Sequence, residues 1–308
     1  MSEIEAVNLR RSFGDKIAVA DLTLHVNGGE IYGLIGPDGA GKTSTLRMLA
    51  GLMEPSGGSV RIMGHDPFRQ GHQVRERLGY MPQQYSLYGD LTVDENLAFF
   101  SEMFCLDREE FQKRSLRLLS LTRLESFGSR RADALSGGMY KKLALACSLL
   151  HNPKALLLDE PTNGVDPISR RELWDILHDF LSEGMAIMLT TPYMDEAARC
   201  HRTGLLLDGR LLEEGNPIEM LRSFPHSVFR VIGDRKRTYD LIERNKDVLA
   251  STPAGDLLRI VVRHGKEPGV LSALAGIDAR VLPATPSFED FFLTRIQERD
   301  KGEGEKRS

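Results

Sequence analysis

The chain has 308 residues, of which 41% are hydrophobic and 27% are charged, which is enough apolar material for two packed domains. Its formal net charge of −4 gives no electrostatic basis for binding bulk nucleic acid, so we expect no nucleic-acid partner. No apolar run reaches the roughly 18 residues of a membrane-spanning helix and no signal peptide is recognisable, so we expect any membrane role to depend on a partner.

Strand and helix patterns alternate along the first part of the chain. Residues 1–30 are expected to form short strands, broken by turns at Phe13-Gly14-Asp15 and Asn27-Gly28-Gly29. The apolar run 31–35 then enters a glycine-rich turn before a helical pattern, and residues 85–150 are mostly helical.

Buried-strand patterns return further along the chain, at 155–160 and 185–191. Between them a helix is predicted from Pro167 to Gly184, with the glycine as its C-cap. Residues 204–215 are typical of a hairpin turning at Asp208-Gly209. Strands that alternate with helices predict an α/β fold, with a mostly parallel sheet covered on both faces.

The pattern changes near Ser223, where shorter strands and helices begin to alternate. The last helix is predicted to begin at Ser287, with Asp290 at the capping-box spacing and several phenylalanines on one stripe. We therefore predict a main domain over 1–222 that contains a helical subdomain at about 85–150. A small α/β domain over 223–297 and a charged, disordered tail over 298–308 follow.

The segment GPDGAGKT, Gly36 to Thr43, matches G-x-x-x-x-G-K-[ST] between a predicted strand and a predicted helix. Its glycines let backbone N–H groups wrap a phosphate, and the helix N-terminus adds a positive dipole. Lys42 would then reach the β- and γ-phosphates, while the Thr43 hydroxyl would bind Mg²⁺. A glycine turn without a ligand is the alternative, but the flanking strand and helix favour a phosphate loop.

Two weaker signals accompany the phosphate loop. Asp159 and Glu160 end a buried strand, where the first would hold Mg²⁺ through water and the second would polarise an attacking water. Alone, two acids after a strand more often form a solvated strand end. The segment LSGGM, Leu135 to Met139, places a serine and two glycines at a helix start, which is a second anion cradle or a simple turn.

Taken in order, GPDGAGKT, YMPQ, LSGGM, LLLDEP and GVDP resemble the motifs of an ATP-binding cassette (ABC) ATPase. The resemblance covers residues 4 to about 222, and it implies a P-loop ABC ATPase core with an antiparallel β subdomain and a helical subdomain. The segments LSGGM and VDPISRRELW are similar to the ATPase subunits of ABC-2 type (multidrug) exporters, especially the first cassette of tandem-cassette exporters. The segment ATPSFEDFFL resembles the closing helix of the small domain appended to many of them.

The resemblance implies roles for individual residues. Phe13 takes the place of the aromatic residue that stacks on adenine, although it would otherwise fill a core. Gln83 matches the residue that senses Mg²⁺ and the γ-phosphate, or else it is an exposed turn glutamine. Asp166 would lie across a dimer interface, or else it caps the helix at Pro167. The implied ATP-binding set is Phe13, Gly36, Pro37, Asp38, Gly39, Ala40, Gly41, Lys42, Thr43 and Ser44.

Three further sets follow from the same resemblance. The implied catalytic residues are Glu160, Gln83 and Asp166. The implied Mg²⁺ residues are Thr43, Gln83 and Asp159. The implied signature residues, which would contact the nucleotide held by a partner, are Ser136, Gly137, Gly138 and Met139. Glutamine is usual at the last of these positions, so a polar contact near the partner's nucleotide is expected to be lost at Met139.

One position breaks the pattern of the resembled family. A switch histidine there hydrogen-bonds the γ-phosphate and helps to position water and Glu160, but the matching residue is Pro192. Proline has no polar side-chain atom and no N–H, although it suits the start of a helix. Loss of one positioned contact to a transition state typically costs a factor of about 10²–10³ in rate. Nucleotide binding should survive, because Lys42, the loop amides and Mg²⁺ supply most of the phosphate contacts.

The resemblance implies an ATPase subunit of an ABC-2 type exporter at the cytoplasmic face of a bacterial inner membrane. It would use ATP and Mg²⁺, face a second ABC cassette in a homo- or heterodimer, and drive transport through separate integral membrane permease subunits. We hypothesise a heterodimer, because a homodimer would lack the histidine at both sites. The alternative is a mainly regulatory cassette. A translation or DNA-repair ABC protein is disfavoured, since no second cassette or long coiled-coil insertion is seen.

Overall fold

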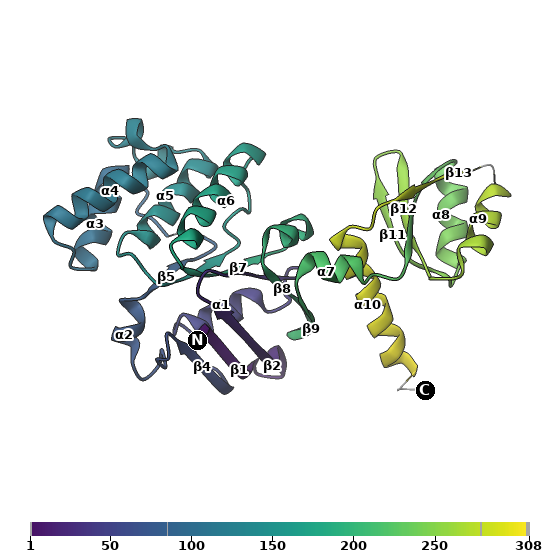
Figure 1. Ribbon diagram of the computed structural model, residues 1–308, viewed down its shortest axis with the longest axis horizontal. Coiled ribbons are helices and arrows are strands. Elements are labelled where there is room, and N and C mark those ends of the chain that lie inside the picture. Colours follow the sequence, from purple (N-terminus) through teal and green to yellow (C-terminus); the bar gives the residue numbers. More distant parts are fainter. Residues whose placement is uncertain (1, 85, 278, 306–308) are drawn as a thin grey trace. The chain divides into compact units, whose positions relative to one another are not determined.

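The computed structural model describes residues 2–84, 86–277 and 279–305, which form one compact unit up to Glu214 and another from Gly215 (Figure 1). The first unit is built on a six-stranded sheet with strand order β5-β6-β7-β3-β8-β9. The pairs β5–β6, β6–β7, β7–β3 and β3–β8 are all parallel. The strands are β3 (Ile31–Ile35), β5 (Leu78–Met81), β6 (Ala155–Asp159), β7 (Ala186–Thr191), β8 (Arg202–Leu207) and β9 (Arg210–Gly215).

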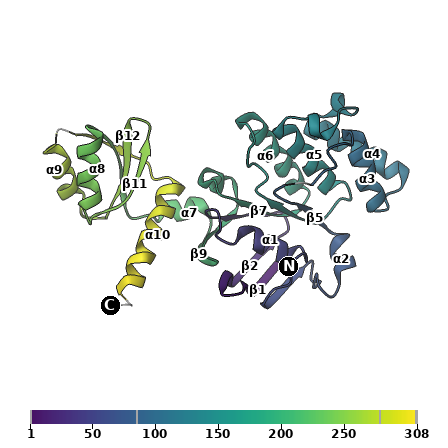
Figure 2. The ribbon, with the colours of Figure 1, turned by 180° about the vertical axis from the view of Figure 1, so that it is seen from behind.

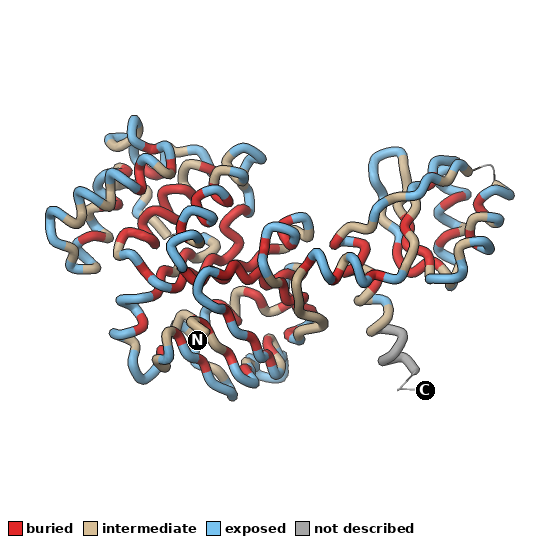
Figure 3. Tube along the Cα trace, in the orientation of Figure 1, coloured by how far each residue is buried: buried red, intermediate tan, exposed pale blue. Residues whose placement is uncertain are grey.

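Both faces of this sheet are buried, which explains why its central strands are continuous apolar runs rather than alternating ones. Successive side chains point to opposite faces. In β6, for example, Leu156 and Leu158 pack into one core while Leu157 packs into the other. The central strands accordingly lie in the most deeply buried part of this unit (Figure 3).

A second, antiparallel sheet with the order β2-β1-β4 lies beyond helix α1 (Lys42–Leu49). Its strands are β1 (Ser2–Phe13), β2 (Lys16–Asn27) and β4 (Gly57–Ile62). The helix contacts strands of both sheets, and Figures 1 and 2 show it on the opposite side of the parallel sheet from α5 and α6. The turn at Gly14 falls as predicted, but β1 and β2 are longer than the short strands expected. A short helix, α2 (Gly71–Arg75), precedes β5.

The other face of the parallel sheet carries the helical part of the first unit. Its α-helices are α3 (Val93–Met103), α4 (Arg108–Thr122), α5 (Gly137–Leu149) and α6 (Pro167–Ser182), with 3₁₀ turns at Glu125–Phe127 and Ala132–Ala134. Helix α3 begins in a full capping box between Thr92 and Glu95. The apolar stripe of α6 includes Trp174, which is 1% exposed in the core that α6 shares with β6 and β7.

The second unit has the order β-α-β-β-α-β and a single antiparallel sheet, β11-β12-β10-β13. Its strands are β10 (Ser227–Ile232), β11 (Val248–Ala254), β12 (Leu257–Val262) and β13 (Arg280–Ala284). Its helices are α7 (Pro217–Arg222), α8 (Arg235–Arg244), α9 (Glu267–Ala275) and α10 (Phe288–Glu305). Strand β11 is an edge strand, the position where a residue such as Pro253 is tolerated.

Both ends of the second unit differ from the sequence expectation. Helix α7 packs against α10, so this unit begins at Gly215 rather than after residue 222. The capping pair of α10 forms as predicted, because Ser287 N donates to Asp290 Oδ2 at 2.7 Å and Asp290 N donates to Ser287 Oγ at 3.3 Å.

The segment predicted to be a disordered tail begins at residue 298, whereas α10 continues to Glu305. Arg295 and Glu298 form an ion pair at 2.9 Å between Nη1 and Oε2, and such i,i+3 pairs support a helix of charged residues. Residues 306–308 of the predicted tail lie outside the described residues.

Candidate active site

The phosphate loop, residues 36–44, has the local structure that its sequence requires. Gly39 and Gly41 have positive φ angles of 80° and 107°. A Cβ at Gly41 would collide with the carbonyl oxygen of Ala18, so glycine is needed there for space as well as for conformation. The loop therefore turns its backbone tightly over the N-terminus of α1, as a phosphate cradle must.

Two neighbouring segments support this loop from outside. The β8–β9 hairpin turns at Asp208 and Gly209, both with positive φ, as a two-residue hairpin of this type needs. Gly209 N donates to Ala40 O at 2.9 Å, and Ala20 N donates to Gly209 O at 2.7 Å. The hairpin thus joins the phosphate loop to β2 and fixes its position.

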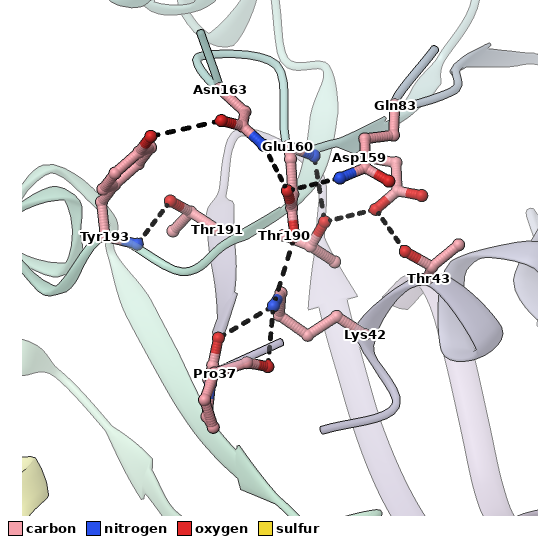
Figure 4. Close-up of polar contacts among 11 residues, drawn as sticks. Pro37, Lys42, Thr43, Gln83, Asp159, Glu160, Asn163, Thr190, Thr191 and Tyr193 are labelled. Carbon is pink, nitrogen blue, oxygen red and sulfur yellow. Dashed lines mark hydrogen bonds and ion pairs between the residues drawn. The ribbon is translucent and has the colours of Figure 1, made fainter. Parts of the chain in front are cut away.

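Lys42 is held inside the loop and is only 4% exposed. Its ammonium donates to Gly36 O at 2.8 Å and to Pro37 O at 3.1 Å (Figure 4). It also lies 3.3 Å from Glu160 Oε1, in an ion pair. A buried cation with one carboxylate partner is well suited to bind an incoming anion.

Asp159 stands at the carboxyl end of β6 with an unsatisfied oxygen. Thr43 Oγ1 and Thr190 Oγ1 both donate to Asp159 Oδ1, at 3.1 and 2.8 Å (Figure 4). Its Oδ2 is buried and has no hydrogen-bond partner among the described residues. Burial raises the pKa of the Asp159 carboxyl, while the two threonine hydroxyls oppose that rise. An orphaned carboxylate oxygen beside the Thr43 hydroxyl is the donor set that Mg²⁺ prefers, so the residues present fit this ion.

Glu160 follows directly, and three side chains hold its carboxylate. Gln83 Nε2 donates to Glu160 Oε2 at 2.7 Å and Asn163 Nδ2 donates to the same oxygen at 3.0 Å, while Lys42 faces Oε1 (Figure 4). The Glu160 backbone has a positive φ of 47°, which is uncommon outside glycine. Such strain is typical of functional sites, where the surrounding structure enforces it.

A cavity of about 420 Å³ opens in front of these groups. Phe13 lies at its edge and is 46% exposed, so it does not fill the core of the antiparallel sheet. The Arg11 guanidinium lies 4.6 Å from the centre of the Phe13 ring. The cavity is lined by Phe13, Lys16, Ala18, Asp38, Gly39, Gly41, Lys42, Thr43, Ser44, Gln83 and Glu160.

The predicted signature residues lie elsewhere, and the residues that line the cavity do not include them. Ser136 is the N-cap of α5 and accepts a hydrogen bond from Met139 N at 3.3 Å. Gly138 packs so closely on α6 that a Cβ would collide with Ser169 Oγ. The Met139 side chain packs against the helical core, which explains how an apolar residue is accommodated there.

Asp166 is also absent from the cavity lining. It is exposed and caps α6, since its Oδ1 accepts hydrogen bonds from the N–H groups of Ile168 and Ser169, both at 3.0 Å. The Ser169 side chain, followed by these backbone N–H groups, lowers the pKa of the Asp166 carboxyl by hydrogen bonding. The capping role considered from the sequence is therefore present within this chain.

Pro192 follows the last residue of β7, beside the entrance to the phosphate loop. The preceding residue, Thr191, pairs with Ile35, and its carbonyl accepts a hydrogen bond from Gly36 N at 3.3 Å. The sequence suggested that Pro192 begins a helix, but no α-helix begins at this residue. Instead Tyr193 is the N-cap of a 3₁₀ helix, η3 (Met194–Arg199), so the proline lies in the turn before it.

Comparison with known proteins agrees with this geometry. The sequence model of the family described as "ABC transporter" matches residues 19–163. A Nod factor export ATP-binding protein I from Cupriavidus metallidurans is 38% identical over 295 residues, covering 93% of this chain and 94% of the relative. The chain belongs to the ABC transporter ATP-binding protein family.

Another relative of this ABC protein is the probable multidrug ABC transporter ATP-binding protein YbhF of Escherichia coli, 40% identical over 283 residues. That match covers 91% of this chain but 49% of the relative, so the chain spans about half the length of YbhF.

Solved structures share the fold of the first unit. The ATP-binding subunit of an ABC transporter aligns with a TM-score of 0.67 and 29% identity, over 72% of this chain and 93% of that one. A post-hydrolysis state of the cassette MJ0796 bound to ADP and Pi aligns with a TM-score of 0.63 and 26% identity, over 69% and 98%. The chain therefore has the mixed α/β fold of a P-loop ABC ATPase, as predicted.

Sequence reasoning missed Thr190 and Asn163, whereas Tyr193 entered it only as a neighbour of Pro192 that could position the water in its place. Thr190 is fully buried, and its hydroxyl donates to Asp159 Oδ1 while accepting from Glu160 N at 3.1 Å. The two threonines at the end of an apolar strand were the available signal, because a buried hydroxyl needs a partner. Asn163 and Tyr193 contact each other, because Tyr193 OH donates a hydrogen bond to Asn163 Oδ1 at 3.3 Å. No local motif indicates that pair.

Proposed function

We propose that the chain binds MgATP in the 420 Å³ cavity and hydrolyses it. One observation carries this proposal: Lys42, Thr43, Asp159 and Glu160, from two separate motifs, converge on a single site. Lys42 and the loop amides would hold the β- and γ-phosphates, and an aromatic face at Phe13 would hold adenine. The Phe13 exposure supports this role, because a core residue would be buried.

The residues of the site divide the work of hydrolysis. Thr43, Asp159 and Gln83 would hold Mg²⁺, whose charge neutralises the developing negative charge of the phosphates. Glu160 would accept a hydrogen bond from the attacking water and orient it toward the γ-phosphate. Its pairing with Lys42 would give way when the ammonium turns to phosphate, which frees Oε1 for the water.

We further propose that the chain is the ATPase of an ABC-2 type exporter and works with separate permease subunits at the cytoplasmic face of a membrane. The names of the relatives, multidrug transport and Nod factor export, support an export role. Among the described residues, no helix is both long and apolar enough to cross a bilayer. An apolar groove of about 700 Å³ beside α3 and α5, lined in part by Phe100, Met103, Phe104 and His151, would receive the permease.

Turnover is proposed to be slow, because Pro192 has no polar atom to offer the γ-phosphate. Such a site works best beside an intact partner, which favours a heterodimer in which this cassette contributes Ser136 and Gly138 to the partner's nucleotide. The second candidate function, a mainly regulatory cassette whose ATP stabilises the dimer, rests on the same proline.

The test is ATP hydrolysis, measured as phosphate release by wild type, Pro192→His and Glu160→Gln, each alone and with the membrane subunits. We expect a slow wild type, a rise of an order of magnitude or more in Pro192→His, and background turnover in Glu160→Gln. Brisk turnover by the wild type with no gain from histidine would refute the impaired site. Wild-type turnover equal to that of Glu160→Gln, with ATP still bound, would favour the regulatory function.

A further inference from the structure

Tyr193, the residue after Pro192, is linked through Asn163 to Glu160, which a switch histidine would help to position. Tyr193 OH donates to Asn163 Oδ1 at 3.3 Å, and Asn163 Nδ2 donates to Glu160 Oε2 at 3.0 Å (Figure 4). We propose that Asn163 and Tyr193 are positioning residues that hold Glu160 in its hydrolytic orientation in this histidine-free site. The inference rests on the proposed ATPase function and adds two residues to it.

The chemistry of the Asn163 amide gives the Tyr193 hydroxyl a role in positioning Glu160. An asparagine amide can be turned by 180°, which exchanges its donor nitrogen and its acceptor oxygen. Only one of the two orientations lets Asn163 donate to the Glu160 carboxylate, because the other would bring two acceptors together. The Glu160 carboxylate selects that orientation, and the phenol of Tyr193 then donates to the remaining Oδ1 and holds the Asn163 side chain in place, so Tyr193 acts on Glu160 through Asn163.

Tyr193 is itself fixed from its backbone and from its ring. Its N–H donates to Thr191 Oγ1 at 3.0 Å, at the end of β7. The Arg170 guanidinium lies 4.3 Å from the centre of the tyrosine ring, and this arginine also pairs with Asp195 at 3.4 Å. Proline at 192 has a fixed φ, which limits the freedom of the short link between strand and ring.

The Asn163 contact matters most once nucleotide is bound. In the structure Glu160 has one cationic and two neutral donors: Lys42, Gln83 and Asn163. A phosphate in the loop would draw Lys42 away, and Gln83 would also face Mg²⁺. Asn163 is then the one donor of the three with no second task, and its bond to Oε2 leaves Oε1 directed at the water.

The experiment compares Tyr193→Phe, Asn163→Ala and the double variant with wild type in steady-state hydrolysis of MgATP by the full chain. Loss of one hydrogen bond of this kind predicts a fall in kcat of about three- to tenfold. The KM for ATP should stay within about twofold, since no phosphate contact is touched. The double variant should be no slower than Asn163→Ala, because both residues act through one bond. Tyr239→Phe, in the second unit, is the matched control and should keep the wild-type kcat.

Rescue separates positioning from a general structural effect. Pro192→His should raise kcat by a larger factor in the Tyr193→Phe background than in wild type, if histidine and the Tyr193–Asn163 pair perform the same task. Equal factors in the two backgrounds, or wild-type kcat in Asn163→Ala, would overturn the inference while leaving the ATPase proposal in place. Wild-type turnover no faster than that of Glu160→Gln would overturn both. Thermal unfolding midpoints should match wild type, since Asn163 is exposed and phenylalanine preserves the ring.

Discussion

Replacing Thr190 with valine should weaken the first unit, although the two side chains have nearly the same shape. The Thr190 hydroxyl is fully buried and donates to a carboxylate oxygen of Asp159 at 2.8 Å. Hydrogen bonds to charged groups contribute about 1.5–3 kcal/mol. Asp159 Oδ1 keeps the bond from Thr43, and Glu160 N keeps the Thr190 carbonyl at 3.2 Å. We therefore expect Thr190→Val to lower the free energy of unfolding by about 2 kcal/mol.

Thr190→Ser is the matched control, because it keeps the hydroxyl and loses one buried methyl, which is about 1 kcal/mol. Urea unfolding followed by tryptophan fluorescence suits the measurement, since the chain has one tryptophan, Trp174, and it is buried in the first unit. The m-value, which is the slope of the unfolding free energy against urea concentration, should not change. If Thr190→Val is as stable as wild type, or more stable than Thr190→Ser, the bond to Asp159 has no stabilising role.

Two further predictions concern single side chains. Phe13→Ala should weaken ATP binding by about 1–3 kcal/mol in a fluorescence titration, whereas Phe13→Trp should retain binding, because a base stacks on either ring. If Phe13→Ala instead lowers the unfolding midpoint as much as a truncation in the core does, Phe13 is a core residue. Burial, reinforced by Arg114, lowers the pKa of His151 from 6.5 to about 4, against the opposing hydrogen bond to Leu78 O. The unfolded chain therefore takes up this proton first, so stability should be lost from about pH 6.5 downward, by at most about 3 kcal/mol near pH 4. The loss should be smaller in His151→Gln. If the free energy of unfolding falls equally steeply with decreasing pH in wild type and in this variant, His151 is not the group responsible.

The residues that sequence reasoning found are those whose chemistry is written in a short segment. Gly36 to Thr43 form a local loop, and Asp159 and Glu160 end a strand, so each motif is visible in a short stretch of sequence. Their meeting is seen in the hydrogen bond from Thr43 to Asp159. Thr190 escaped notice because its role depends on β7 lying beside β6 in one register, with Asp159 opposite Thr190. A single sequence does not state that register.

The contact between Asn163 and Tyr193 was harder still to find. They are thirty positions apart, and their contact depends on the backbone course of two turns rather than on any strand pairing. The same holds for Pro192, whose suitability for a helix start is real but local. In the structure Pro192 instead follows the six residues of β7 and precedes a 3₁₀ helix that starts at Met194 and buries Glu196. In the second unit, β11 has the sequence VLASTPA, which contains a proline and lacks the alternation of apolar and polar residues that would identify a strand.

The tight packing of Gly138 against Ser169 joins the starts of two helices, α5 and α6, at one point. Ser136 caps the first helix and Asp166 caps the second, so both exposed turns are anchored to this joint. A rotation of the helical part that moves one turn must carry the other with it. If a facing cassette binds at both turns, a single movement of the two helices would bring both turns into contact with it together. A bulkier residue at 138 would separate the helix starts, so that the two turns could move independently.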